Sequence, residues 1–541
     1  MQYKVLITDN VDQGCDEILA GQGLEVVRAL GKSEDELAEL VGDFDAMVVR
    51  SAVKVRRPLI EKMSRMKVIG RAGAGVDNID VEAATEKGIL VMNTPGGNTI
   101  SVAEHTVAML LSLCRKIPAA NRSLQNEEWN RKAFVGTELL GKTVGVLGLG
   151  RIGREVVKRL QGFDVTLIGY DPMLSLEAIK AMGIEPVDFE SLVSRSDILS
   201  LHLPLNDETR DMIGEDELSR LKEGAFIVNC ARGGIVDEKA LLAALDRGQI
   251  KGAAFDVFIN EPVLFPNELI NHAHVVATPH IAASTSEAQK RVALAVARQI
   301  ASLLNGGEVV GLVNAGGLGD ALQHEFTPFA KAAISLGRVV RELLGSENLT
   351  IWGEVFGENT SHMIEGLEAS LFVGLLEGKA PVVNTVNAGM MAKNRGIESR
   401  FSGEGPHKSY HFLLQATVQH GDNDNIVRAG VTLFGSGEPR LVMLNDHWLD
   451  IRPEGPMLLV DHDDRPGTLA GISTILGEAQ INIADLSLGR AEQGNGAMTL
   501  IRVDTPADPS TLQRVSSVEN VRRVQALQLN HKSLPTSETI A

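Results

Sequence analysis

The stretch Thr143-Val-Gly-Val-Leu-Gly148-Leu-Gly150-Arg-Ile-Gly153 decides the fold of the chain around it. A short apolar run predicts a strand, a Gly-x-Gly-x-x-Gly turn follows, and residues 154–160 continue as a helical segment. Glycines at this spacing allow a tight turn, the close approach of a pyrophosphate, and close packing of helix on strand. The N–H groups and the dipole at the start of the helix favour an anion. The stretch therefore predicts a dinucleotide-binding strand–turn–helix unit.

A carboxylate follows at the position that a dinucleotide requires. Asp171 comes directly after the next predicted strand, 164–170. It comes roughly twenty residues after the glycines, where an acidic side chain binds the ribose hydroxyls. It would also repel a 2′-phosphate, so we favour NAD over NADP. The alternative is a structural glycine turn that binds no nucleotide.

Strand-like and helix-like segments alternate on both sides of this motif. Before it, Val/Ile-rich runs occupy 4–7, 46–50, 67–71 and 88–92; after it come 143–147, 164–170, 198–203, 225–229, 252–257 and 274–277. Helical segments include 35–41 and 284–304. The alternation predicts parallel sheets with helices on both faces. A long apolar helix before the motif starts either at Asn98 or at Ser101, which has capping-box spacing to Glu104.

Three reactive side chains follow neighbouring predicted strands. They are Arg232, Glu261 and His280. Ligands of open α/β sheets bind beyond the carboxyl ends of the strands. An arginine can hold a carboxylate, a histidine can take a hydroxyl proton near neutral pH, and a glutamate can orient the imidazole. The combination predicts oxidation of a small, anionic 2-hydroxy acid. Taken alone, the arginine could be an ordinary surface charge and the glutamate an ordinary loop acid. The histidine is not unique either, because His202 also follows a strand.

Composition narrows the class of protein further. The 541 residues suggest about three to four domains, and the formal net charge of −18 disfavours nucleic acid and anionic membranes as partners. The chain has three cysteines, Cys15, Cys114 and Cys230, an odd number without metal-binding spacing. This favours a reducing compartment and no metal site. No signal-like segment begins the chain and no apolar run is long enough to cross a bilayer. We therefore expect a cytoplasmic protein.

At these residues the sequence resembles the D-isomer-specific 2-hydroxy-acid dehydrogenases, over about residues 1–315. Gly148–Gly153, Cys230-Ala-Arg-Gly-Gly and Thr278-Pro-His-Ile-Ala carry the resemblance. It implies that Arg232 binds substrate, that His280 is the acid/base, and that Glu261 supports it. The NAD site that it implies consists of Ala74, Gly148, Gly150, Arg151, Ile152, Gly153, Asp171, Leu203, Cys230, Ala231, Arg232, Asp256, His280, Ala282 and Ala283.

The resemblance extends to a long form of the family. Val49-Arg50-Ser51 and Gly70-Arg71-Ala-Gly-Ala-Gly-Val-Asp look like its substrate loops. This implies oxidation of 3-phospho-D-glycerate to 3-phosphooxypyruvate, the first step of phosphorylated L-serine biosynthesis. Arg50 and Arg71 could neutralise the phosphate, and the N–H groups near Gly75 and Val76 could take the carboxylate. Ser51 and Asn98 complete the expected substrate site.

The C-terminal half resembles regulatory modules of that long form. Asn384-Thr-Val-Asn-Ala-Gly looks like its intervening domain, where Lys393 and Arg395 could bind an anionic effector or form a solvated charge run. The segments Leu459-Val-Asp-His-Asp-Asp-Arg-Pro-Gly and Gln480-Ile-Asn482-Ile are similar to an ACT domain. There His462, Asp464 and Asn482 would contact an amino acid such as serine. Asp464 stands where serine-sensitive relatives have Asn; it lacks amide donors but could meet an ammonium group.

The expected architecture is an α/β protein with two Rossmann-like, doubly wound parallel-sheet domains, one split around the other. The substrate-binding domain is expected to comprise residues 1–97 and 286–315, and the NAD-binding domain residues 98–285. An α+β intervening domain follows at 316–453 and a ferredoxin-like ACT domain at 454–530, and the chain ends in a tail, 531–541. The resemblance implies a homo-oligomer, a dimer or tetramer. Three alternatives stay open: a dehydrogenase of another D-2-hydroxy acid (glycerate, which gives hydroxypyruvate, or 2-hydroxyglutarate), a non-catalytic NAD-sensing scaffold, and an ACT-driven sensor with vestigial catalysis.

Overall fold

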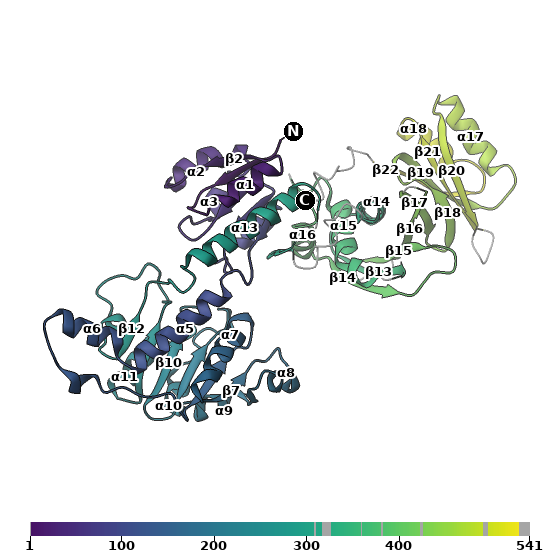
Figure 1. The fold of residues 1–541 in the computed structure, drawn as a ribbon. Coiled ribbons are helices and arrows are strands. Elements are labelled where there is room, and N and C mark those ends of the chain that lie inside the picture. Colours follow the sequence, from purple (N-terminus) through teal and green to yellow (C-terminus); the bar gives the residue numbers. More distant parts are fainter. Residues whose placement is uncertain are drawn as a thin grey trace. The chain divides into compact units, whose positions relative to one another are not determined.

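The computed structural model describes most of the chain. Described are residues 2–307, 310–315, 326–358, 360–379, 382–421, 426–435, 437–490 and 496–529. The predicted tail, 531–541, lies outside them. The chain forms two compact units: unit 1 combines Met1–Asn93 with Val296–Ala541, and unit 2 is Thr94–Ala295 (Figure 1). Within the described residues, no helix has the length and apolar character needed to cross a membrane.

Unit 2 is built on a seven-stranded parallel sheet in the order β12-β11-β10-β9-β6-β7-β8. Its strands are β6 (Thr143–Leu147), β7 (Thr166–Tyr170), β8 (Glu185–Pro186), β9 (Ile198–Leu201), β10 (Ala225–Asn229), β11 (Ile250–Phe255) and β12 (Val275–Ala277). The strand order reverses beside β6, so β6 and β9 form the topological switch point where such sheets bind ligands. This is the doubly wound fold predicted from the sequence.

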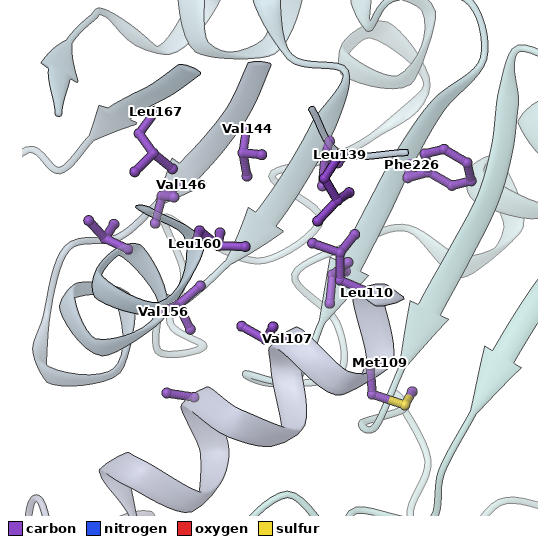
Figure 2. Close-up of a cluster of buried hydrophobic side chains, with 14 of the residues drawn as sticks. Val107, Met109, Leu110, Leu139, Val144, Val146, Val156, Leu160, Leu167 and Phe226 are labelled. Carbon is purple, nitrogen blue, oxygen red and sulfur yellow. The ribbon is translucent and has the colours of Figure 1, made fainter. Parts of the chain in front are cut away.

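Helices cover both faces of that sheet. They are α5 (Thr99–Cys114), α6 (Ile117–Gln125), α7 (Arg151–Leu160), α8 (Leu176–Lys180), α9 (Phe189–Arg195), α10 (Glu215–Arg220), α11 (Glu238–Asp246) and α12 (Glu268–Asn271). Val107 and Leu110 of α5 and Val156 and Leu160 of α7 pack with β6 in one buried core (Figure 2). Burial of these side chains fixes the start of α7 against the end of β6.

The start of α5 settles one open alternative. The helix begins at Thr99 with Asn98 as its N-cap residue, so the start at Asn98 is confirmed. The capping box of Ser101 and Glu104 is wrong, because Ser101 already lies inside the helix and its hydroxyl pairs with Thr285 Oγ1 at 2.8 Å. The predicted helix after the glycine turn also begins earlier, at Arg151 directly after Gly150.

The N-terminal part of unit 1 holds a five-stranded parallel sheet in the order β2-β1-β3-β4-β5. Its strands are β1 (Lys4–Ile7), β2 (Glu25–Arg28), β3 (Ala46–Val49), β4 (Val68–Arg71) and β5 (Leu90–Met92), and its helices are α1 (Gly14–Gly21), α2 (Glu34–Leu40), α3 (Arg57–Glu61) and α4 (Val81–Glu86). The long helix α13 (Ser286–Leu304) returns the chain to this sheet. Asn314 then binds the Val91 N–H and the Ile89 carbonyl, at 2.8 and 2.9 Å.

A six-stranded mixed sheet follows in the order β14-β13-β15-β16-β17-β18. Its strands are β13 (Leu349–Gly357), β14 (Glu398–Glu404), β15 (Phe412–His420), β16 (Ile426–Phe434), β17 (Glu438–Leu444) and β18 (His447–Ile451). The accompanying helices are α14 (Thr327–Leu344), α15 (Ile364–Leu376) and α16 (Ala388–Asn394). Only β13 and β14 run parallel; the other neighbours are antiparallel.

The C-terminal module has the predicted strand–helix–strand–strand–helix–strand order. It consists of β19 (Gly455–Asp463), α17 (Thr468–Glu478), β20 (Ile483–Arg490), β21 (Gly496–Val503), α18 (Pro509–Ser516) and β22 (Val521–Leu529), with sheet order β20-β21-β19-β22. Both helices pack on one face of this antiparallel sheet. The other face meets α14, where Gln525 donates to the Glu342 carbonyl at 3.0 Å.

Candidate active site

The glycine turn of unit 2 has the shape that a dinucleotide pyrophosphate needs. Gly148 has a φ of +90°, and a Cβ there would lie 2.7 Å from the His202 carbonyl oxygen. Gly153 lies in the first turn of α7, and its Cβ would come within 2.1 Å of the Gly148 oxygen. Both positions exclude a side chain, so the backbone stays open at the N-terminus of the ten-residue helix α7.

The predicted ribose-binding acid lies beside this turn. Asp171 follows β7, and its Oδ2 accepts a hydrogen bond from the Leu149 N–H at 2.8 Å. Its Oδ1 accepts from the Met173 N–H at 2.9 Å. A carboxylate oxygen can accept more than one hydrogen bond, so these contacts orient Asp171 and leave room for ribose hydroxyls. The glycine turn and the acid together fit NAD.

Two of the residues predicted to be catalytic, His280 and Glu261, are in direct contact. His280 Nδ1 lies 2.6 Å from Glu261 Oε2, while Glu261 Oε1 accepts from the Phe258 N–H at 3.0 Å. Burial raises the pKa of Glu261, but hydrogen bonds from His280 and Phe258 outweigh it and leave the pKa below its usual value. The glutamate is therefore ionised at neutral pH and holds Nδ1 as the protonated nitrogen. His280 also has a φ of +51°, a strained backbone conformation common at functional sites.

A buried carboxylate organises the loop that carries His280. Asp256 is fully buried. Its Oδ1 accepts hydrogen bonds from the Thr278 hydroxyl at 2.6 Å and from the Ile281 N–H at 2.9 Å. Its Oδ2 accepts a hydrogen bond from the Ala282 N–H at 2.8 Å. Burial raises the pKa of Asp256, yet hydrogen bonds from His105, Thr278 and the two N–H groups bring it below its ordinary value. The ionised Asp256 thus holds both sides of the His280 backbone.

Arg232 is positioned by a turn at the end of β10. The buried Asn229 side chain spans this turn: its Oδ1 accepts from the Ala231 N–H at 3.0 Å, and its Nδ2 donates to the Arg232 carbonyl at 2.9 Å. Arg232 Nη1 donates to the Ala231 carbonyl at 2.7 Å. Because β10, β11 and β12 are adjacent parallel strands, Arg232, Glu261 and His280 leave the same edge of the sheet.

His202, the competing histidine, has a different environment. Its Nε2 pairs with the Ser200 hydroxyl at 2.8 Å, and burial lowers its pKa to about 4. It is neutral at physiological pH and has no carboxylate partner among the described residues. Its backbone N–H donates to the Leu147 carbonyl at 2.8 Å, which places His202 beside the glycine turn.

The other residues predicted for NAD binding fall into three groups. Leu203 packs beside Gly148, while Ile152 joins the buried core. Cys230 is buried, which raises the pKa of its thiol to about 12 and keeps it unreactive. Arg151, Ala231 and Ala283 lie on the turns and helix start of unit 2, whereas Ala74 belongs to unit 1.

The predicted substrate residues divide between the two units. In unit 1, Arg71 is the last residue of β4, and its Nε donates to the carbonyl oxygen of Arg50 at 3.1 Å. The Arg50 N–H in turn donates to Asp9 Oδ2 at 2.5 Å. Both arginines therefore lie at the carboxyl edge of one sheet, with the exposed Ser51 and the half-buried Gly75 and Val76 in the neighbouring loops. Asn98 belongs to unit 2, where its buried Oδ1 has no hydrogen-bond partner among the described residues.

The residues predicted for an effector are engaged within the chain. His462 is buried, with its Nδ1 2.8 Å from the Asp463 carbonyl and its Nε2 2.8 Å from Thr499 Oγ1. Asp464 pairs with Arg490 at 2.8 Å, and Asn482 donates to Asp504 at 2.7 Å. In the intervening domain Lys393 is exposed, and Arg395 lies 3.5 Å from Glu347.

Reasoning from sequence missed the residues that support the catalytic ones. The predicted site residues do not include Thr278, His105 or Asn229. In the structure His105 Nε2 lies 3.1 Å from Thr278 Oγ1. Asn229 fixes the Arg232 turn. Thr278 and Asn229 each stand at a strand end within two or three residues of a predicted catalytic residue, which is a usable signal. His105 offers no such signal, because it lies on α5, far away in sequence.

Family models match three segments of the chain. The model described as "D-isomer specific 2-hydroxyacid dehydrogenase, NAD binding domain" matches residues 107–282. That described as "D-3-phosphoglycerate dehydrogenase intervening domain" matches 325–445, and the ACT domain model matches 457–520. The ACT match places a module for binding small-molecule effectors at the C-terminal sheet.

Relatives cover the chain almost from end to end. D-3-phosphoglycerate dehydrogenase from Methanocaldococcus jannaschii is 41% identical over 97% of this chain and 100% of its own length. The same enzyme from Bacillus subtilis is 36% identical over 97% of this chain and 100% of its own. Among solved structures, a glyoxylate reductase from Paecilomyes thermophila is 33% identical with a TM-score of 0.53, covering 58% of this chain and 98% of that one.

Fold and site define an NAD-dependent oxidoreductase of the D-isomer-specific 2-hydroxyacid type. At 41% identity over the whole length of a relative, the chain belongs to the D-3-phosphoglycerate dehydrogenase family. The family, the fold class, the cofactor NAD and the class of NAD-dependent oxidoreductase, all predicted from the sequence, are confirmed.

Proposed function

We propose that this chain oxidises 3-phospho-D-glycerate to 3-phosphooxypyruvate, the first step of phosphorylated L-serine biosynthesis, with Arg232, Glu261 and His280 as its catalytic set. NAD, when bound, supplies the nicotinamide that accepts a hydride from C2. His280 takes the proton of the 2-hydroxyl as that hydride leaves. Arg232 holds the adjacent carboxylate and polarises the oxygen that becomes the carbonyl.

The contact between His280 and Glu261 carries this proposal. An ionised Glu261 accepts the Nδ1–H at 2.6 Å, so Nε2 keeps its lone pair for the substrate proton. As the imidazolium forms, the carboxylate stabilises its positive charge. Asp256 supports the same step indirectly, because it holds Thr278, Ile281 and Ala282 around the strained His280 backbone.

We assign the remaining roles by unit. Arg50 and Arg71 neutralise the substrate phosphate, the N–H groups of Gly75 and Val76 take its carboxylate, and Ser51 and Asn98 complete the substrate site. Residues 1–97 and 286–315 then act as the substrate-binding domain and 98–285 as the NAD-binding domain. The intervening and ACT domains, 316–453 and 454–530, regulate the enzyme, which works as a homo-oligomer in the cytoplasm.

The amino-acid effector proposed for the ACT domain is serine. His462, Asp464 and Asn482 would have to exchange contacts within the chain for contacts with the ligand. Asp464 would meet the ammonium group, since a carboxylate cannot supply amide donors. Lys393 and Arg395 are the corresponding proposal for an anionic effector.

The proposal is tested with purified protein, saturating NAD and a panel of D-2-hydroxy acids, each with and without L-serine. NADH formation should be fastest with 3-phospho-D-glycerate, with kcat/KM at least about a hundredfold above that for D-glycerate, since a phosphate adds charge-assisted hydrogen bonds. Equal or better turnover of D-glycerate or D-2-hydroxyglutarate would contradict the substrate, and no NADH with any acid would contradict catalysis.

A further inference from the structure

A small cavity lies between the intervening domain and the ACT domain, both within unit 1. Its volume is about 130 Å³. Leu343 of α14 and Leu444 of β17 line it from the intervening domain, and Leu459 of β19 and Met498 of β21 from the ACT sheet. Both domains therefore contribute apolar side chains to its lining, beside polar ones such as Asn445 and Gln525.

Two opposite charges face each other on the ACT wall of this cavity. Asp461 on β19 and Arg523 on β22 are direct cross-strand partners in an antiparallel pair, so their side chains leave the same face of the sheet. Despite this register, no ion pair joins them within the described part of the chain, and there the Asp461 carboxylate makes no hydrogen bond. An acidic and a basic group thus stand side by side, separately available to a ligand.

Arg523 is held in place by a chain of contacts that crosses the domain boundary. Its Nη2 donates to Gln525 Oε1 at 2.8 Å, and Gln525 Nε2 donates to the Glu342 carbonyl of α14 at 3.0 Å. A ligand that binds Arg523 is therefore connected to the contact that joins the two domains.

We infer that this cavity binds a small zwitterion, a free α-amino acid, with its ammonium group on Asp461 and its carboxylate on Arg523. A simple anion would be repelled by Asp461 and a simple cation by Arg523, whereas a zwitterion satisfies both. A cavity of about 150 Å³ holds a six-carbon ring, so the available volume suits an amino acid with a short side chain. The apolar residues of the lining, such as Leu343 and Leu459, can accept that side chain.

This site is separate from the effector residues predicted from the sequence. His462 points to the opposite face of the ACT sheet, where it is buried beneath the helices and bonded to Thr499. Asp464 and Asn482 lie outside the cavity lining. The two sites can therefore be distinguished by substitution.

The test is isothermal titration calorimetry of the full-length protein with glycine, L-alanine and L-serine. N-acetyl-L-alanine and L-alaninamide serve as probes that each lack one charge. Asp461→Asn and Arg523→Gln remove one partner each, at residues outside the catalytic site. The matched controls are Arg522→Gln, whose guanidinium pairs with Asp463 instead, and Asn482→Ala at the predicted effector position.

At least one of the three amino acids should bind with one site per chain and raise the thermal unfolding midpoint. Asp461→Asn and Arg523→Gln should each weaken that binding about tenfold to a hundredfold, as for a lost hydrogen bond to a charged group. Both controls should bind as the wild type does, and the single-charge analogues should not bind. Absence of saturable binding, or binding lost in Asn482→Ala but kept in both cavity variants, would overturn the inference.

Discussion

Asp256 is a buried carboxylate in unit 2 that holds the loop around His280. Its two oxygens hold the Thr278 hydroxyl and the N–H groups of Ile281 and Ala282, on both sides of His280. His280 keeps a backbone φ of +51° only because its neighbours are held on both sides. Asp256 is thus a positioning residue for His280.

Asp256→Asn should destabilise this loop by about 2 kcal/mol at neutral pH, because an amide group would face the Ala282 N–H with a donor. Hydrogen–deuterium exchange of residues 278–283 should accelerate by about thirtyfold. The pKa of Asp256 is lowered on folding, so its stabilising effect is present above the pKa of the unfolded chain and is lost as pH falls through the folded value. The difference from wild type should hold from pH 8 to about 5 and shrink below about 4.

The control for that experiment is Asp246→Asn, a change at a largely exposed aspartate of the same unit. It should leave exchange of 278–283 unchanged. A variant at Asp256 that exchanges like the wild type at pH 7 would show that the loop does not depend on this carboxylate.

The convergence of the three proposed catalytic residues could be predicted because each comes soon after a strand, and parallel strands end at one edge. Arg232, Glu261 and His280 lie within about six residues of a strand end. Their supports were harder to predict, because His105 reaches Thr278 from a helix 173 residues away in sequence. Such contacts depend on tertiary packing, which no local pattern encodes.

Among the elements, the turn from β6 into α7 is the most constrained. Gly153→Ala should weaken NAD binding more than about tenfold, because the new Cβ would lie 2.1 Å from the Gly148 oxygen and force the turn apart. The measurement is the dissociation constant for NADH by fluorescence titration. Gly162→Ala is the matched control: it follows the same helix, has open space around its Cβ, and should bind NADH normally. Equal affinity in both variants would contradict this account of the turn.

Hydrophobic pattern predicted the central strands of both parallel sheets and the edge strands β5 and β12, but it did not predict the edge strands on the other sides. The predicted strands 4–7, 143–147 and 225–229 match β1, β6 and β10 to the residue. The edge strands β2 and β8 were missed, because β2 alternates with exposed positions and β8 has only two residues. An edge strand buries less surface and so carries a weaker apolar signal.

The segment Asn384-Thr-Val-Asn, noted from sequence as a mark of the intervening domain, docks on the loop after α4. Asn384 Nδ2 donates to the Gly88 carbonyl at 2.8 Å, and Asn387 Nδ2 donates to the carbonyls of Glu86 and Val382 at 3.2 and 3.0 Å. Asn387 is fully buried. The intervening domain is therefore tied to the first sheet of unit 1 by amide side chains.

Asn387→Ala should lower the free energy of unfolding of unit 1 by about 2–3 kcal/mol, since buried carbonyl groups would lose their donor. Chemical denaturation followed by circular dichroism measures the change. The exposed Asn394→Ala, on the neighbouring helix end, should cost less than about 0.5 kcal/mol. An equally small cost for Asn387→Ala would mean that this segment does not hold the domains together.

At the scale of the whole molecule, the residues proposed to select the substrate belong to unit 1, whereas the proposed catalytic residues belong to unit 2. Arg50 and Arg71 lie at one sheet edge in unit 1, joined by the bond from Arg71 Nε to the Arg50 carbonyl. The double variant Arg50→Gln with Arg71→Gln should lower kcat/KM for 3-phospho-D-glycerate by about a thousandfold, because two charge-assisted hydrogen bonds are lost. Turnover of D-glycerate should change by less than about threefold.

Arg56→Gln, at an exposed arginine of the same sheet domain, controls for the loss of charge alone. It should leave both substrates unaffected. An unchanged preference for the phosphorylated substrate in the double variant would favour a different phosphate site.

In the proposed mechanism His280, held by Glu261, transfers the substrate proton. The most direct measurement is the turnover number for NADH formation from 3-phospho-D-glycerate by His280→Ala, paired with its NADH dissociation constant. General acid–base catalysis by a positioned histidine contributes about 10²–10⁴-fold, so turnover should fall by that factor while NADH affinity stays within about threefold of wild type. Near-normal turnover by His280→Ala would contradict the account.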